Sequence, residues 1–208
     1  MSRNNRIAVA SVGAFVVAAA VVGGLVACQG NPSATPEATP STSQTTSSPS
    51  ASPSTADPEA EAVEAAEGAM RDYYRVTGLS RQNPEDFNVE DLKKVAITSA
   101  LIDAQSLHTT YVTTGTRTIG DVEVEVVKVH DVDLTNRPKA KPQPVVPEVQ
   151  LMVCVDATDV NVVDKDGKSL NKPGRQTRNL FRIGVVNYEY PDGPWLTAYT
   201  DPQEGKPC

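Results

Sequence analysis

A sharp change of composition near Asp57-Pro58 limits where this chain can build a hydrophobic core. Residues 29–57 consist almost entirely of Ser, Thr, Pro and Ala, and they show no apolar periodicity. Such a segment cannot bury enough apolar surface to offset the entropy lost on ordering, so we expect it to be disordered. Residues 58–208 have the length of one domain with its own core. The folded part of the chain is therefore expected to be residues 58–208.

The N-terminal stretch carries the pattern of an export signal. Arg3 and Arg6 precede the uncharged residues 7–27, which end in Leu25-Val26-Ala27-Cys28. An aliphatic residue three positions before a cysteine, with a small residue next to it, resembles the signal of bacterial lipoproteins. The resemblance implies a signal peptide over residues 1–27, a lipid on Cys28, and a tether over residues 28–57.

A retained membrane helix is the alternative for this stretch, because an apolar run of about twenty residues can span a bilayer. Gly23-Gly24 weakens such a helix by roughly 1 kcal/mol per glycine. Both alternatives keep the arginines inside and place the rest of the chain outside. The expected location is thus the extracytoplasmic face of the cell membrane, with the lipid as anchor.

The charge and the cysteines restrict the partners and the chemistry. The formal net charge is −7, and loss of Arg3 and Arg6 with the signal would make the chain more acidic still. This argues against a nucleic acid as the partner. If Cys28 carries the lipid, Cys154 and Cys208 remain as a pair in an oxidising compartment, where a disulfide is the expected state.

Helical spacing of apolar residues predicts three helices in the first part of the domain. One covers about residues 58–76, with Asp57 as its N-cap and Gly78 as its stop. A short second helix follows Asn88, and a third covers about residues 98–113.

The second half of the domain reads as antiparallel strands. Alternating apolar residues predict strands at about 120–134, 148–163 and 176–190, and a fourth around Trp195 to Tyr199. The alternation changes phase at Val127 and again at Val160, which predicts bulges and a curved sheet. Helices followed by a run of strands indicate an α+β fold.

Several short stretches of the domain add a resemblance to a known fold. They are Val153 to Asp156, Asp164 to Lys168, Arg175 to Arg182, Asp192 to Leu196, and Lys206 to Cys208. With them, the chain resembles actinobacterial lipoproteins of unassigned function, and its order of elements is similar to the NTF2-like cone, also called SnoaL-type or cystatin-like. The resemblance implies three N-terminal helices packed on a curved four-stranded antiparallel sheet that encloses a pocket. Proteins of this kind include isomerases, dehydratases, cyclases and binding domains. No catalytic motif of theirs matches a residue here, so no catalytic residue is assigned.

Three residues are candidates for the pocket: His108, Tyr111 and Trp195. His108 lies on an apolar helix face, where it would act as an acid or base, or else pack as a core residue. Trp195 suits either a pocket wall or the core.

Two acidic stretches have residue types that bind metals, but the spacing in neither supports a metal site. In a strand, His130 points to the opposite face from Asp131 and Asp133. Asp164 to Gly167 lacks the ligands of a calcium loop at the required spacing, which favours a hairpin turn. We therefore expect no metal site and no cofactor.

The sequence leads to one main functional hypothesis and two alternatives. The main hypothesis is a non-enzymatic, lipid-anchored domain that binds a small ligand or an envelope protein. One alternative is an isomerase or dehydratase that uses His108 or an acid in the cone as its base. The other is a structural envelope protein, dimerising through the outer face of the sheet.

Overall fold

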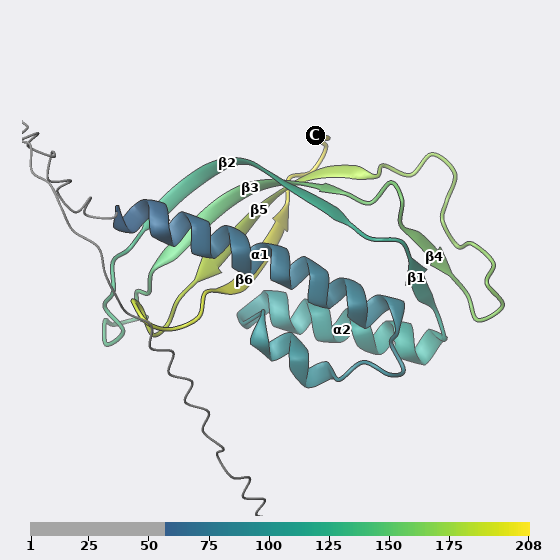
Figure 1. The fold of residues 1–208 in the computed structure, drawn as a ribbon, viewed down its shortest axis with the longest axis horizontal. Coiled ribbons are helices and arrows are strands. Elements are labelled where there is room, and N and C mark those ends of the chain that lie inside the picture. Colours follow the sequence, from purple (N-terminus) through teal and green to yellow (C-terminus); the bar gives the residue numbers. More distant parts are fainter. Residues whose placement is uncertain (1–56) are drawn as a thin grey trace, which may run out of the picture. The chain divides into compact units, whose positions relative to one another are not determined.

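The computed structural model describes residues 57–208, which form an α+β unit. Helices come first in the chain and are followed by strands that make two antiparallel sheets (Figure 1). The larger sheet has the strand order β2-β3-β5-β6, and the smaller one pairs β1 with β4. The elements are α1 (Pro58–Gln82), the 3-10 helix η1 (Val89–Lys94), α2 (Thr98–Thr114), β1 (Arg117–Ile119), β2 (Glu123–Asp133), β3 (Glu148–Asp156), β4 (Asn161–Val163), β5 (Arg178–Val186) and β6 (Leu196–Pro202).

The predicted signal, the predicted lipidation site Cys28 and nearly all of the predicted tether lie outside the described residues. Within residues 57–208, no helix has the length and apolarity needed to cross a membrane.

Helix α1 begins where the sequence predicted. The Asp57 carboxylate accepts a hydrogen bond from the backbone N–H of Glu59 at 3.1 Å, and Pro58 occupies the first helical position. An N-cap of this kind stabilises a helix by about 1 kcal/mol. Ala62, Ala66 and Met70 then recur at helical spacing and are buried against the larger sheet.

The prediction that α1 stops at Gly78 is wrong, because the helix continues to Gln82. Glycine lowers helix stability by about 1 kcal/mol, but it does not end a helix whose next turn is held by tertiary packing. Ser80 in that turn is buried, and its hydroxyl donates to the carbonyl oxygen of Thr77 at 2.9 Å. The helix ends before Pro84, since a residue that precedes proline is disfavoured in the helical conformation.

The second predicted helix is a 3-10 helix. The described domain therefore has two α-helices and one 3-10 helix before the strands, instead of three α-helices. Asn88 caps η1 as expected, accepting from the N–H of Glu90 at 3.2 Å, and fully buried Leu92 anchors it. The third predicted helix is confirmed as α2, which ends at Gly115 in the left-handed conformation with φ of 64°.

β3 and β5 form the centre of the larger sheet. Val149, Leu151, Val153 and Val155 alternate along β3 and belong to one core cluster with Ile183 and Val185 of β5. The same cluster includes the buried residues of the first half of α1. The predicted alternation of β3 is therefore confirmed.

The predicted bulge at Val127 is confirmed in β2, the strand at one edge of the sheet. Its pairing with β3 shifts register between Val126 and Lys128, and again between Val129 and Asp131. Bulges bend a strand and increase its twist. Figure 1 shows the strands of this sheet arching over the helices.

The predicted single strand over residues 148–163 is wrong, because the chain leaves the larger sheet after Asp156. The Asp156 carboxylate accepts from the backbone N–H of Thr158 at 2.8 Å and closes a turn there. Residues 161–163 then pair with β1 as β4. The second change of phase thus marks a move between sheets rather than a bulge.

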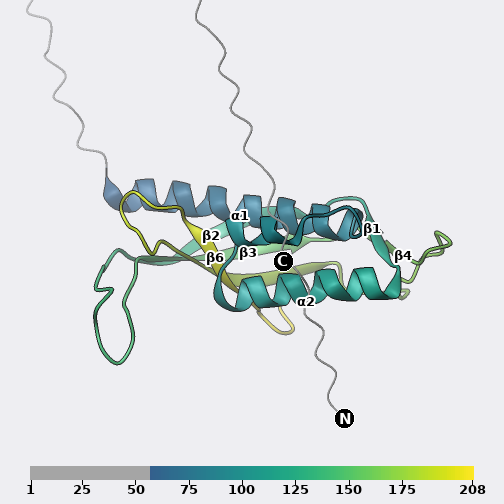
Figure 2. The ribbon, with the colours of Figure 1, turned by 90° about the horizontal axis from the view of Figure 1, so that it is seen from below.

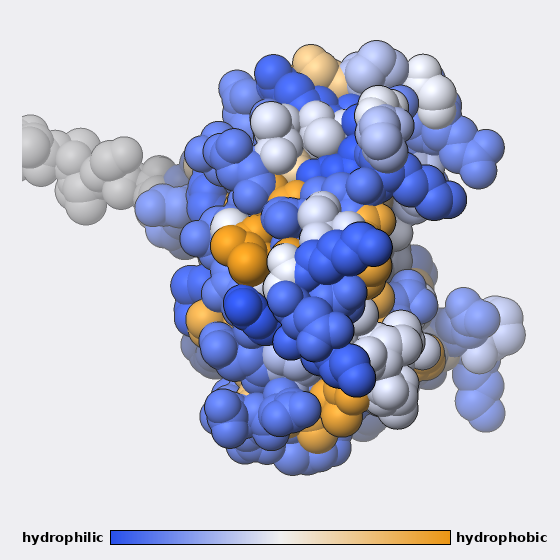
Figure 3. Space-filling view, turned by 90° about the vertical axis from the view of Figure 1, so that its right-hand side faces the viewer, coloured by the Kyte–Doolittle hydropathy of each residue, from blue (hydrophilic) through white to orange (hydrophobic). Residues whose placement is uncertain are grey.

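The two α-helices lie on the same face of the larger sheet (Figures 1 and 2). α1 contacts all four strands, whereas α2 packs against β6. A second core cluster lies between the second half of α1, η1 and α2, and it includes Tyr73, Leu92, Ala100 and Ala104. At the end of the domain that carries β1 and β4, hydrophobic residues appear as small separate patches among hydrophilic ones (Figure 3).

Candidate ligand cavity between the helices and the sheet

A cavity of about 330 Å³ lies where the two core clusters meet. Its walls come from the second half of α1, the middle of α2, and the adjoining ends of β3, β5 and β6. Tyr74 packs against both clusters, and neither cluster fills the space between them. The volume falls at the lower end of the roughly 300–1,000 Å³ typical of ligand pockets, so it suits a small molecule.

Two consecutive tyrosines of α1 form one wall. The rings of Tyr73 and Tyr74 lie 5.3 Å apart at 81°, an edge-to-face contact that favours a fixed arrangement. Burial raises the pKa of both phenols, and that of Tyr74 the more strongly. Both hydroxyls are protonated at neutral pH, as those of ordinary tyrosines are, and they can donate hydrogen bonds to a ligand.

Most of the remaining wall is apolar. Val155 and Phe181 project from the sheet, and Val122 precedes β2. From α2 come Ala104, which is buried, and Leu107, which is 41% exposed and so borders the opening. Thr77, Thr177, Asn179 and Thr200 add short polar groups. Such a wall suits a ligand that is mostly apolar and carries a few polar groups.

One cation and one anion face this cavity, Arg81 of α1 and Asp103 of α2. The Arg81 Nε–H donates to the carbonyl oxygen of Thr77 at 3.0 Å. Neither charged group forms an ion pair with any residue in the part of the chain that the structure describes. Their charges act on Tyr73 in opposite directions, since Arg81 lowers the pKa of that phenol and Asp103 raises it.

His108 is not among the residues that line this cavity. It is 8% exposed, its Nδ1 lies 3.4 Å from the carbonyl oxygen of Ser80, and its ring centroid is 5.6 Å from that of Phe87. These contacts are those of a packed residue between α2 and the C-terminal part of α1. The helix face predicted for His108 is thus correct, but the cavity opens one turn away, beside Ala104 and Leu107.

Tyr111 and Trp195 also lie elsewhere. Tyr111 borders a separate hollow formed with residues 82–86 and 115–117, and burial raises the pKa of its phenol. Trp195 packs against the main core cluster, with its ring 6.2 Å from that of Tyr190. The structure therefore does not bring the three predicted pocket residues together. Arg81 and Asp103 gave no usable signal in the sequence, because only the packing of α2 beside α1 makes them neighbours of one cavity.

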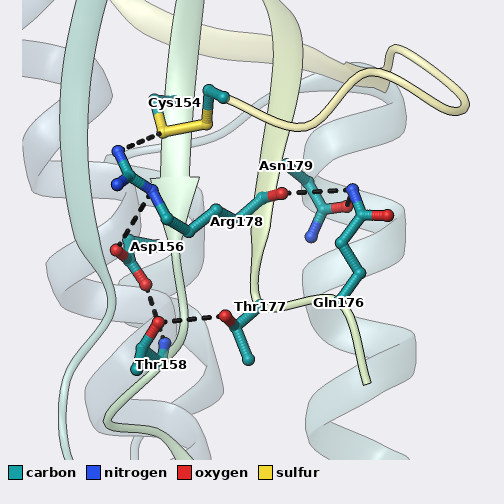
Figure 4. Close-up of a disulfide and its surroundings, with 8 residues drawn as sticks. Cys154, Asp156, Thr158, Gln176, Thr177, Arg178 and Asn179 are labelled. Carbon is teal, nitrogen blue, oxygen red and sulfur yellow. Dashed lines mark hydrogen bonds and ion pairs between the residues drawn. A yellow bond between two sulfur atoms is a disulfide. The ribbon is translucent and has the colours of Figure 1, made fainter. Parts of the chain in front are cut away.

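The predicted cysteine pair meets on the outer side of the larger sheet. A disulfide joins Cys154 and Cys208, and Figure 4 shows the C-terminal segment reaching β3. The Arg178 guanidinium lies over this bond, with Nη2 at 3.6 Å from the Cys154 Sγ and Nε at 3.4 Å from an Asp156 carboxylate oxygen.

Asp156 is further fixed by its neighbours. Hydrogen bonds from the side chain and the backbone N–H of Thr158 hold the pKa of the Asp156 carboxyl below its usual range. The Thr158 and Thr177 hydroxyls are also hydrogen-bonded to each other, with their oxygens 3.0 Å apart, as Figure 4 shows. This network ties the end of β3 to the start of β5, where Thr177 also lines the cavity.

Neither acidic stretch forms a metal centre in the residues described. Among residues 57–208, no group of three or more His, Cys, Asp or Glu side chains is arranged to hold a metal ion. Asp164 to Gly167 make the expected hairpin turn, in which the N–H of Gly167 donates to the carbonyl oxygen of Asp164 at 3.0 Å. The carboxylate of Asp164 accepts from the N–H groups of Asp166 and Lys168.

Comparison with known proteins adds little to the geometry. The sequence matches no protein-family profile and no curated protein. Among solved structures, the intermembrane space region of the chloroplast protein ARC6 is similar, with a TM-score of 0.42 and 13% sequence identity. The alignment covers 67% of this chain and 94% of that chain. A likeness this distant carries no argument about the function.

Proposed function

We propose that this chain is a lipid-anchored, extracytoplasmic protein whose folded domain binds a small ligand and catalyses no reaction. The proposed anchor is Cys28, supported by the residues that precede it in the sequence. We further propose that the domain is an NTF2-like cone, which fits the two helices on one face of an arched antiparallel sheet.

The cavity between α1, α2 and the sheet is the observation that carries the ligand-binding role. It is bordered by aromatic and aliphatic side chains and opens beside Leu107. A binding role is favoured over catalysis through His108 by the packing of that residue. Its ring lies against Ser80 and Phe87, and it is not among the residues that line the cavity.

Narrowing the opening tests the ligand site. Leu107→Trp adds an indole at the mouth, and calorimetric titration with naphthamide, a neutral aromatic probe, measures occupancy. We expect wild type to bind the probe and Leu107→Trp to lose at least about tenfold in affinity, since the larger ring takes up space in the cavity at residue 107. Ile102→Trp is the matched control on the same helix, because Ile102 is 66% exposed and does not line the cavity. Equal binding by both variants would exclude this cavity as the site.

The anchor is tested separately. Mass spectrometry of the mature protein is expected to show an N-terminal Cys28 that carries lipid, and Cys28→Ala should abolish both the lipid and the cleavage. A mature chain that retains residues 1–27 without lipid would refute the anchor and leave the ligand site unaffected.

A further inference from the structure

The three arginines of α1 are not equivalent. Arg71 pairs with Glu67 and Arg75 with Asp72, both at 2.9 Å on the solvent side of the helix. Arg81 has no acidic partner within residues 57–208 and instead faces the cavity. An arginine left without a partner beside an apolar cavity is an available binding group for an anion.

The orientation of Arg81 is fixed by its own helix. Its Nε–H is held by the carbonyl oxygen of Thr77 at 3.0 Å, whereas its two Nη groups donate to no acceptor among the described residues. The positive charge acts on Tyr73, Tyr74 and Tyr111, lowering the pKa of each phenol against the effect of burial. The guanidinium is thus oriented in advance, and the two Nη groups together can hold both oxygens of one carboxylate.

We propose that Arg81 binds the carboxylate of a small organic acid whose apolar part lies against Phe181 and Val155. This inference rests on the proposed function and names the class of ligand. A carboxylate matches the planar end of the guanidinium in shape and charge. Much of the remaining cavity wall is apolar, so the rest of the ligand is expected to be aromatic or aliphatic.

Asp103 restricts this class further. It is the single Asp, Glu, Lys or Arg residue of α2, and it faces the same cavity as Arg81. Its negative charge opposes the entry of a second anionic group, because like charges in one site repel each other. The expected ligand is therefore a monocarboxylic acid and not a dicarboxylic acid or a phosphate ester.

A matched pair of probes tests the charge independently of the cavity. Naphthoate and naphthamide share the same ring and differ in charge, and both are titrated calorimetrically into the full-length protein. The variants are Arg81→Met, which keeps an apolar stem, Arg81→Lys, which keeps the charge, and Asp103→Asn. Thermal melts of each variant verify that the fold is retained.

Loss of the guanidinium should weaken naphthoate by about tenfold, as expected for one partly exposed charged hydrogen-bond pair, and leave naphthamide within about twofold. Arg81→Lys should recover part of the naphthoate affinity. Asp103→Asn should tighten naphthoate by about two- to threefold, since it removes a repulsive charge that is partly screened by solvent.

The outcomes separate this inference from the function on which it rests. If Arg81→Met weakens naphthoate and naphthamide equally, or leaves naphthoate unchanged, the carboxylate anchor is refuted. If Arg81→Met gives such a result while naphthamide still binds wild type and Leu107→Trp abolishes that binding, the ligand cavity is supported but the carboxylate site at Arg81 is not. If neither probe binds wild type, both the ligand cavity and the carboxylate site at Arg81 are refuted for aromatic ligands.

Discussion

At the scale of single residues, Gly184 shows how one missing side chain shapes the outer face of the sheet. The ring of Tyr199 on β6 lies directly over Gly184 on β5, where a Cβ atom would overlap it. The ring crosses β5, and its hydroxyl donates to a Glu148 carboxylate oxygen on β3 at 2.8 Å. Glycine at 184 is therefore required by contact with a neighbouring strand and not by an unusual backbone angle.

This contact predicts a destabilised Gly184→Ala variant. The added methyl must displace the Tyr199 ring, which should lower the free energy of unfolding by about 1–3 kcal/mol, as overpacking does. Chemical denaturation monitored by the fluorescence of Trp195 measures it. In a Tyr199→Ala background the same substitution should cost much less, because the ring is gone. An equal loss in both backgrounds would contradict the contact as the cause.

At the scale of elements, Gly78 in α1 is the opposite case. A Cβ atom built there meets nothing within 4 Å, and the residue lies in the interior of the helix. Gly78→Ala should therefore raise the free energy of unfolding by about 1 kcal/mol, through helix propensity alone. Gly68→Ala, at another open position of α1, should behave alike in the same denaturation assay. A loss of stability in either variant would show that the glycine has a role in packing that the contacts do not reveal.

The C-terminal segment is held to the sheet by a covalent bond and by two backbone hydrogen bonds. The N–H of Leu180 donates to the Lys206 carbonyl oxygen at 3.1 Å, and the N–H of Gln203 donates to the Leu180 carbonyl oxygen at 2.8 Å. The disulfide closes a chain segment of 54 residues. In the chain-entropy description, a loop of that length contributes about 4 kcal/mol.

Reduction of the disulfide should therefore lower the melting temperature by on the order of 10 °C. The paired variant Cys154→Ala, Cys208→Ala should melt near the reduced protein, and its own melt should not respond to the reductant. Should the wild-type melt stay unchanged under reductant, Cys154 and Cys208 would not form a stabilising bond in solution.

The elements also show what the sequence alone could predict. The alternation along β3, the bulge near Val127 and the cap at Asp57 are local patterns, and each is confirmed. The end of α1 and the pairing of β1 with β4 depend on contacts between distant segments, so local patterns misplaced the first and missed the second. The cavity is the least local feature of all, because Arg81 and Asp103 meet only through the packing of two helices.

At the scale of the whole molecule, tyrosine phenols with raised pKa values make the stability of the folded domain depend on pH. Burial raises the pKa of Tyr74, which packs against both clusters. Burial is the larger cause that raises the pKa of Tyr199, and the hydrogen bond to the Glu148 carboxylate is the second. At a pH between the two pKa values, such a phenol is still protonated in the folded state, whereas the same phenol in the unfolded chain is ionised. The unfolded state then binds fewer protons, so stability falls as pH rises above about 10, the pKa of an unfolded tyrosine.

The variant Tyr74→Phe isolates the first of these two effects. It removes a buried phenol that must stay neutral, so the wild-type stability should decline above pH ~10 by up to about 1.4 kcal/mol per pH unit more steeply than that of the variant. The difference in free energy of unfolding between the two proteins, measured by urea denaturation, should be constant near neutral pH and shift in favour of the variant in alkali. Parallel stability curves across that range would mean that Tyr74 ionises as readily in the folded domain as in the unfolded chain, and that the junction of the two clusters is open to water.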